Sequence, residues 1–125
     1  MLEQGKDFYF ITRYPLASKP FYTMPEGEKH SRGFDLECKG VEVSSGSQRI
    51  HNIDLLIERL RACNLDPKDF EAYISAFRYG MPPHGGWGFG LDRFVWYLAG
   101  LPNVREARLF PRDRYRFLEP RHRST

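Results

Sequence analysis

The first half of the chain alternates apolar and polar residues with the two-residue period of β-strands. The segment FYFIT at residues 8–12 is aromatic and β-branched, and two prolines follow it, so we predict a strand leading into extended chain. Residues 34–44 alternate on either side of Lys39-Gly40, which predicts a hairpin with its turn at that pair. Residues 23–33, rich in Gly, Pro, Ser and charged side chains, are predicted to form a loop.

Helical periodicity replaces this alternation in the second half of the chain. In residues 51–63 the apolar residues recur at the i, i+3, i+4 and i+7 positions of one helix face, namely Ile53, Leu56, Ile57 and Leu60. A second helix is expected to begin at Asp66, which can cap it, and to end at Gly80. Its buried stripe is predicted to be Phe70, Tyr73, Ile74 and Phe77.

Glycine alternates with Trp87 and Phe89 in residues 85–90, so one face of this predicted strand has no side chains and leaves room for a flat group. A helix from Leu91 to Ala99 follows directly. We expect its inward stripe to be Leu91, Phe94, Val95 and Leu98. A helix N-terminus offers free N–H groups, and Arg93 adds a planar cation, which suits a nucleotide site. A purely structural glycine-rich turn is an equally open alternative at this point.

The stretch from Glu42 to Arg49 is the second candidate site. Glu42 and a serine hydroxyl are hard oxygen ligands suited to Mg²⁺, and Arg49 can bind a carboxylate through two parallel hydrogen bonds. In a regular strand Glu42 and Ser44 share a face and Ser45 points to the other, but the Ser- and Gly-containing run 44–47 favours a bend. The alternative is a simple ion pair between Glu42 and Arg49.

Composition narrows the class of protein. The 125 residues are 41% hydrophobic, enough for the core of about one domain and too many for a disordered chain. The apolar runs are far shorter than the roughly 20 residues that cross a bilayer. The N-terminus lacks a signal-peptide pattern, so we expect a cytoplasmic protein without a membrane partner.

Cys38 and Cys63 have no metal-ligand spacing and are expected to be buried free thiols.

Charge is distributed unevenly along the chain. The formal net charge is +3, and residues 105–123 contain seven arginines against Glu106, Asp113 and Glu119. This arginine-rich segment is consistent with binding to phosphate or nucleic acid, and equally with a solvated surface.

Four stretches together carry a family resemblance. They are DFYFITRYPLASKPFYTMP at 7–25, GVEVSSGSQRIH at 40–51, GMPPHGGWGFGLDR at 80–93 and LPNVREARLFPRD at 101–113. In this order they resemble the catalytic domain of class II aminoacyl-tRNA synthetases, most closely the aspartyl-tRNA synthetases of the archaeal and eukaryotic type. The second stretch resembles the family's acidic-serine-arginine strand, and the third resembles its third signature motif.

The resemblance implies a fold and a domain organisation. Residues 1–125 are expected to be the C-terminal portion of a class II catalytic domain, without the first two motifs or the anticodon-binding β-barrel. The expected fold class is α+β, with an antiparallel sheet from residues 8–12, 34–45 and 85–90 and flanking helices packed on one face. By the same resemblance the complete protein is expected to be a homodimer.

The resemblance also implies an activity, which is ATP- and Mg²⁺-dependent activation of aspartate followed by transfer to tRNA. Glu42 would hold the Mg²⁺ that bridges the ATP phosphates, and Ser45 would share that metal and touch the amino acid. Arg49 would bind the side-chain carboxylate of aspartate. The ATP site would be lined by Gly90, Leu91, Asp92 and Arg93. Arg93 would stack on the adenine, and Glu42 and Arg93 would be the catalytic residues.

Two other functions stay open at this point. One is a synthetase-like paralogue that activates or amidates aspartate without charging tRNA, and the other is a non-catalytic ATP-binding or interaction module. Asp92 stands where the most similar type usually has Glu, and residues 116–120 also depart from the family pattern. The chain by itself is expected to be weakly active or inactive, because the resemblance places half of the active site outside it.

Overall fold

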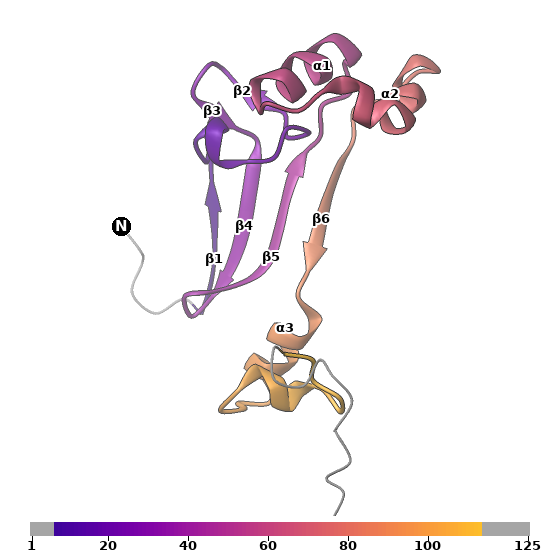
Figure 1. Cartoon of the computed structure of the whole chain (residues 1–125). Helices are drawn as coiled ribbons and strands as arrows, with labels where there is room; N and C mark the ends of the chain where they lie inside the picture. The colour runs from indigo at the N-terminus through magenta and orange to yellow at the C-terminus, as the bar shows by residue number, and fades with distance from the viewer. Residues whose placement is uncertain (1–6, 114–125) are drawn as a thin grey trace, which may run out of the picture. The chain divides into compact units, whose positions relative to one another are not determined.

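The computed structural model describes residues 7–113, and the chain divides into two compact units, residues 1–89 and 90–125. The first unit contains a four-stranded antiparallel sheet in the order β1-β4-β5-β6 (Figure 1). The strands are β1 (Phe8–Thr12), β4 (Gly33–Cys38), β5 (Val41–Gln48) and β6 (Gly85–Phe89). The predicted strands are therefore confirmed. The family departures at 116–120 and the end of the arginine-rich segment lie outside the described residues.

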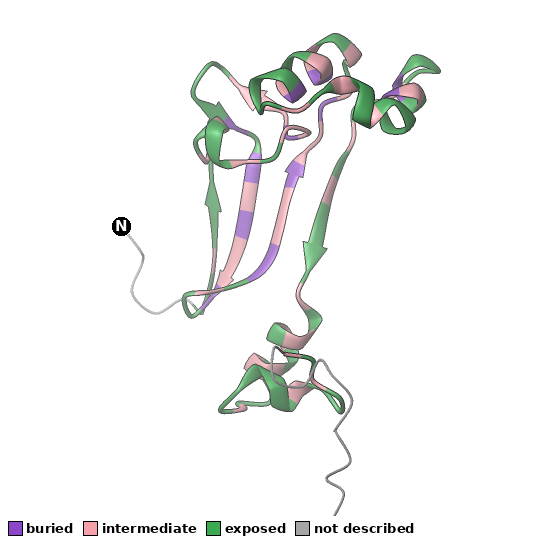
Figure 2. Ribbon diagram, in the orientation of Figure 1, coloured by how far each residue is buried: buried purple, intermediate pink, exposed green. Residues whose placement is uncertain are grey.

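The β4–β5 hairpin turns at Lys39-Gly40, as the alternation predicts. Lys39 and Gly40 both have positive φ, at 48° and 81°, between the paired residues Cys38 and Val41. Two left-handed residues in a two-residue loop follow the right-handed twist of the strands they join. The central strands β4 and β5 carry the buried positions of the sheet, whereas the outer strands β1 and β6 are mostly exposed (Figure 2).

The predicted loop at residues 23–33 is only partly a loop. It contains two short paired strands, β2 (Pro25–Glu26) and β3 (His30–Ser31), joined through Gly27, whose φ is +66°. Ser31 is fully buried because its backbone N–H and its hydroxyl both donate to Tyr14 O, at 2.8 and 3.0 Å. These bonds join distant parts of the chain, and for that reason local composition does not predict them.

Both predicted helices of the first unit are present. Helix α1 (Ile53–Ala62) is capped by Asn52, whose side chain accepts a hydrogen bond from Leu55 N at 2.9 Å. Helix α2 (Glu71–Arg78) follows a 3₁₀ turn, η2 (Pro67–Phe70), and Asp66 caps that turn through Lys68 N at 3.0 Å. The second helix therefore begins at the predicted residue, but its first turn is 3₁₀ rather than α. Another 3₁₀ turn, η1 (Leu16–Ser18), follows β1.

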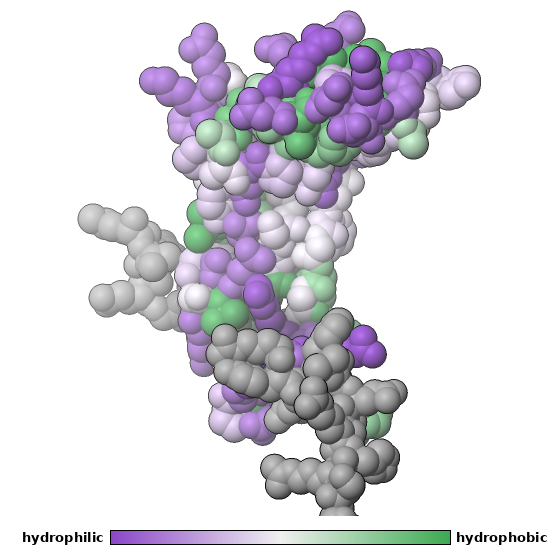
Figure 3. Space-filling model, in the orientation of Figure 1, coloured by the Kyte–Doolittle hydropathy of each residue, from purple (hydrophilic) through white to green (hydrophobic). Residues whose placement is uncertain are grey.

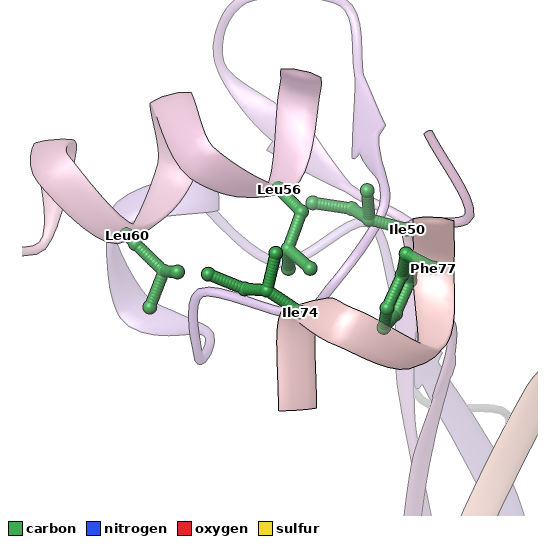
Figure 4. Close-up of a cluster of buried hydrophobic side chains, with 5 residues drawn as sticks. All are labelled: Ile50, Leu56, Leu60, Ile74 and Phe77. Carbon is green, nitrogen blue, oxygen red and sulfur yellow. The ribbon is translucent and has the colours of Figure 1, made fainter. Parts of the chain in front are cut away.

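The hydrophobic core of the first unit lies between these helices. Its five buried members point toward one another from α1, from α2 and from the segment between β5 and α1, namely Ile50, Leu56, Leu60, Ile74 and Phe77 (Figure 4). None of the five belongs to β1, β4, β5 or β6. The expectation that the helices pack on one face of the sheet is thus wrong, and α1 and α2 lie at one end of the strands (Figure 1). Each apolar helix stripe is buried mainly against the other helix.

The outer face of α1 is hydrophilic. Asp54, Glu58 and Arg61 are exposed along it, while Leu56 and Leu60 on the opposite face are fully buried. In the view of Figure 3, strongly hydrophilic residues gather over the helical end of this unit. This helix is amphipathic in the ordinary sense, with one solvated face.

In the second unit, helix α3 (Leu91–Leu98) is followed by the 3₁₀ turn η3 (Val104–Ala107). The predicted helix is confirmed, but its predicted inward stripe is wrong, because Leu91 and Leu98 are 63% and 65% exposed and no residue of α3 is buried. An eight-residue helix and one 3₁₀ turn have too little surface to enclose that stripe. Leu109 and Phe110, part of the arginine-rich segment, are exposed as well.

The two cysteines are free thiols with different surroundings. Cys38 is buried in the sheet, whereas Cys63 is exposed at the C-cap of α1, so the expectation that both are buried is wrong for Cys63. Residue 63 lies just beyond the apolar stripe that buries the helix. No helix within residues 7–113 is long and apolar enough to cross a membrane.

Candidate active-site face of the sheet

The two faces of the sheet differ in chemistry. Directly opposite residues of an antiparallel pair point to the same face, so the register assigns each side chain. The aromatic face carries Phe8, Phe10, Phe34, Leu36, Trp87 and Phe89. The polar face carries Asp35, Glu37, Ser45, Ser47, Gly86 and Gly88. Rings of Phe10 and Phe34 meet edge to face at 5.9 Å, as neighbours on one face should.

A β-bulge brings Glu42 to the polar face. Ser45 lies opposite Asp35 and Ser44 opposite Leu36, but Glu42 lies opposite Glu37, so Val43 is the extra residue on β5. Without this shift Glu42 and Ser45 would point to opposite faces. The bend predicted within residues 44–47 is therefore wrong in its position, because the strand is continuous there and the irregularity is the bulge at Val43. Glu42 and Ser45, the two predicted metal ligands, share the polar face.

Asp35 lies at the centre of this face and is nearly buried. The Ser45 hydroxyl donates to Asp35 Oδ1 at 2.5 Å, and Lys19 Nζ lies 3.1 and 3.3 Å from the two carboxylate oxygens. Burial raises the pKa of Asp35, but hydrogen bonds from Ser45, Tyr14 and Lys19 and the charge of Lys19 lower it below the usual value overall. Asp35 is therefore a fixed, charged carboxylate beside Ser45.

Tyr14 completes this network. The ammonium of Lys19 lies 3.8 Å from the centre of the Tyr14 ring. Burial and the hydrogen bond with Asp35 raise the pKa of Tyr14 to about 12. Sequence reasoning missed Asp35, Lys19 and Tyr14. The one available signal was an aspartate in the interior of a predicted strand, where that residue is depleted.

The polar face fits a magnesium ion that is also held by a substrate. Glu42 and Ser45 supply oxygen donors, the type that Mg²⁺ prefers, whereas Asp35 is paired with Lys19. The hydroxyl of Ser47 on the same face is buried and has no hydrogen-bond partner among the described residues. Within residues 7–113 no group of three or more His, Cys, Asp or Glu could hold a metal. Phosphate oxygens would have to complete the coordination, as is usual for Mg²⁺.

Arg49 follows β5 and faces a cavity of about 470 Å³. The cavity is lined by Phe21, Tyr22, Arg49, Phe70, Tyr73, His84 and Gly85. The half-buried guanidinium forms no ion pair or hydrogen bond with any described residue. The alternative pairing with Glu42 is therefore wrong, since seven residues of extended strand separate the two Cα atoms by roughly 20 Å.

Two cavity residues, His84 and Tyr73, were not predicted as site residues. Tyr73 was expected in the buried stripe of the second helix, but it is 40% exposed. His84 O accepts a hydrogen bond from Arg49 N at 2.9 Å, which joins the start of β6 to the end of β5. The ring atom His84 Nδ1 lies 3.0 Å from Pro82 O, so Nδ1 carries a proton and donates it there. Burial raises the pKa of Tyr73, and the charge of Arg49 opposes that rise. No sequence periodicity connects these side chains with Arg49.

Strand β6 has one face without side chains, as its alternating glycines predict. Gly86 and Gly88 lie on the polar face, opposite Ser47 and Ser45, and an added Cβ at Gly88 would meet nothing within 4 Å. Trp87, 70% exposed, lies on the aromatic face. The polar face is thus open to a flat group at this edge strand.

The remaining predicted site residues, Gly90–Arg93, lie at the start of the second unit, at the N-terminus of α3. Gly90 is the N-cap of α3. Because glycine has no side chain to accept a hydrogen bond, no N-cap side chain satisfies the backbone N–H groups of the first helical turn, Leu91, Asp92 and Arg93. Asp92 Oδ2 pairs with Arg108 Nε at 2.5 Å within this unit. Arg93 is exposed in the first helical turn. Such a helix start is suited to an anionic group.

These features match a known family. The model described as tRNA synthetases class II (D, K and N) matches residues 1–114, and the chain belongs to this family. Among its relatives is the aspartate–tRNA(Asp/Asn) ligase of Thermus thermophilus, 53% identical over 112 residues, which are 90% of this chain and 26% of the relative. The aspartate–tRNA(Asp) ligase of Pyrococcus horikoshii is 52% identical over 117 residues, 92% of this chain and 27% of the relative.

Solved structures agree with this assignment. The aspartyl tRNA synthetase from Entamoeba histolytica superposes with a TM-score of 0.86 at 40% identity, over 92% of this chain and 24% of that one. The asparaginyl-tRNA synthetase from Pyrococcus horikoshii gives a TM-score of 0.82 at 35% identity, over 90% of this chain and 28% of that one. The chain therefore spans about a quarter of the length of the relatives it matches. Its antiparallel sheet with flanking helices is part of a class II catalytic domain.

Proposed function

We propose that the protein containing this chain is an aspartate–tRNA ligase, and that residues 1–125 form the C-terminal portion of its catalytic domain. The observation that carries the proposal is Arg49, a half-buried guanidinium that faces a cavity and has no described carboxylate partner. A half-buried guanidinium that faces a cavity and has no carboxylate partner among the described residues is suited to bind a carboxylate ligand. Curated relatives at about 50% identity are aspartate–tRNA ligases, which supports aspartate as that ligand.

The reaction needs positioning and charge neutralisation more than proton transfer. The α-carboxylate of aspartate attacks the α-phosphorus of ATP in line, and pyrophosphate leaves, giving aspartyl-adenylate; the aspartyl group then passes to the 3′ end of tRNA. In this reaction Arg49 binds the side-chain carboxylate with its planar fork of N–H groups, which orients aspartate for attack. Asp35 holds the Ser45 hydroxyl in a fixed position beside the amino acid.

The residues proposed for ATP follow from the resemblance of the two motifs. Glu42 and Ser45 would hold Mg²⁺ on the polar face, and this ion would neutralise phosphate charge when bound. The bare face at Gly86 and Gly88 leaves room for the nucleotide. In the second unit Gly90, Leu91 and Asp92 would line the ATP site through the start of α3. Arg93 would stack on the adenine through its planar guanidinium.

The proposal extends to partners and location. Aspartate, ATP and tRNA would be the substrates of the complete protein, which would act as a homodimer in the cytoplasm. The roles of Glu42, Ser45, Arg49 and Gly90–Arg93 rest on the resemblance of the two motifs and, for Glu42 and Ser45, on the polar face that they share.

The test uses the full-length protein in ATP–pyrophosphate exchange with aspartate and, separately, with asparagine. We expect aspartate-dependent exchange, and Arg49→Ala should lower kcat/KM for aspartate by about 100-fold or more, as expected when one partner of a buried charge pair is removed. Arg49→Lys should have a kcat/KM for aspartate nearly as low as that of Arg49→Ala, because an ammonium group cannot form two parallel hydrogen bonds with a carboxylate. Arg78→Ala, which removes an exposed arginine paired with Glu71 on α2, is the matched control.

The outcome separates the candidate functions. Exchange with asparagine alone would contradict aspartate as the substrate, a relevant alternative because similar structures include asparaginyl-tRNA synthetases. Aspartyl-adenylate formation without aspartyl-tRNA formation would instead support the paralogue. Absence of ATP binding by calorimetry would exclude both enzymes and leave only a non-catalytic interaction module.

A further inference from the structure

The Arg49 guanidinium packs against the Tyr22 ring. Its guanidinium carbon lies 4.3 Å from the centre of that ring, a cation–π distance. Gly86 is also nearby, since a Cβ added there would lie 3.6 Å from Arg49 Nη2 and 3.7 Å from Nε. The Tyr22 ring therefore restrains the guanidinium, and the lack of a side chain at Gly86 leaves room for it.

The Tyr22 ring is itself anchored to the end of β5. Tyr22 O accepts from Ile50 N at 2.9 Å, Met24 N donates to Gln48 O at 2.9 Å, and Thr23 forms an antiparallel bridge with Arg49. Thr23 and Ile50 are both buried at 1% exposure. These bonds fix the backbone that carries Tyr22 to the backbone that carries Arg49, so the stacked pair is not a chance contact of two surface side chains.

We propose that Tyr22 is the positioning residue for Arg49. The ring fixes the plane of the guanidinium, so that its N–H fork is oriented for the side-chain carboxylate before aspartate arrives. This inference rests on the proposed function of Arg49 as the carboxylate-binding residue. An arginine side chain has several free rotatable bonds, and a ligand that must order them binds more weakly than one that meets an ordered fork.

The ring and the hydroxyl of Tyr22 have separable roles. A cation–π contact needs the aromatic face and not the hydroxyl, so phenylalanine at this position retains it. Leucine or methionine fills much of the same volume without a π-face. Aspartate alone meets Arg49 in this proposal, so ATP binding should not depend on Tyr22.

The first experiment is ATP–pyrophosphate exchange with the full-length protein. Tyr22→Leu should raise KM for aspartate about 10-fold, which corresponds to about 1.4 kcal/mol, while kcat and KM for ATP stay within about twofold. Tyr22→Phe should retain the wild-type values. Tyr22→Met replaces Tyr22→Leu in this experiment if the leucine variant does not fold. The control is Tyr79→Leu, which changes a 92% exposed tyrosine of the same unit.

The second experiment needs no activity. Phenylglyoxal modifies accessible guanidinium groups, and peptide mass spectrometry measures the rate at Arg49. Loss of the ring in Tyr22→Leu or Tyr22→Met should accelerate modification several-fold, whereas Tyr22→Phe should leave the rate unchanged.

The two experiments fail in different ways. A wild-type protein that shows no aspartate-dependent exchange would refute the proposed function, while the modification rates would still test the stacked contact. An unchanged KM for aspartate and an unchanged modification rate in the leucine variant would overturn the positioning role. A phenylalanine variant as impaired as the leucine variant would also overturn it, since the ring would then not be the active feature.

Discussion

Gly46 sits where three strands leave no room for a side chain. It pairs with Phe34 on β4 and Trp87 on β6, and all three lie on the aromatic face. A Cβ at this position would lie 2.5 Å from Phe34 Cζ, 2.7 Å from Trp87 Cβ and 2.8 Å from Gly86 O. Gly86 O is a backbone atom of β6, which pairs with β5, so it cannot move away without disturbing the hydrogen bonds between the two strands.

We therefore expect Gly46→Ala to destabilise the protein by about 3 kcal/mol, the upper part of the range for overpacking. For a cooperative unit of 150–250 residues this corresponds to a fall in Tm of roughly 6–12 °C. The measurement is calorimetric or fluorescence-detected unfolding of the full-length protein with and without the substitution. Activity at low temperature should be retained in the folded fraction if the polar face is unchanged.

Gly88→Ala is the matched control in the neighbouring strand. Gly88 lies on the polar face and an added Cβ meets nothing within 4 Å, so stability should change by less than about 0.5 kcal/mol. If the nucleotide lies along this bare face, Gly88→Ala should raise KM for ATP. Equal Tm values for wild type and Gly46→Ala would refute the packing argument, because they would show that the three strands can accommodate a methyl group at position 46.

Two further predictions concern Asp35 and the helical core. The depressed pKa of Asp35 contributes stability that is present above its unfolded value of about 4 and is lost as pH falls through the folded pKa. Urea unfolding should therefore show Asp35→Asn less stable than wild type at pH 7, with a smaller difference at pH 3; a pH-independent difference would contradict this assignment. Leu60→Ala, at a fully buried position of α1, should cost about 2–5 kcal/mol in urea unfolding. Glu58→Ala on the exposed face of the same helix should cost much less, and similar losses for both would contradict the proposed core.

Several elements follow from local pattern alone. The apolar stripe of residues 53–60 predicts α1, and Asp66-Pro67 predicts the start of the second helix, because capping and periodicity depend on neighbours a few residues away. The turn at Lys39-Gly40 and the bare face of Gly86 and Gly88 are likewise visible in the sequence. The identity of Glu42, Ser45 and Arg49 as candidate site residues came from residue type and motif resemblance, and their roles stay predictions.

Tertiary structure decided how these parts combine. The bulge at Val43 is a matter of strand register, and only this shift places Glu42 on the face that carries Ser45. The contacts of Asp35 with Lys19 and of Arg49 with Tyr22 join segments separated by 16 or more residues. Helices α1 and α2 lie at the end of the sheet because each buries its stripe mainly against the other. By itself the sequence determined the elements and the chemistry available to them. The tertiary structure decided which side chains meet, because register and long-range contacts depend on hydrogen bonds and packing between segments that local propensity does not connect.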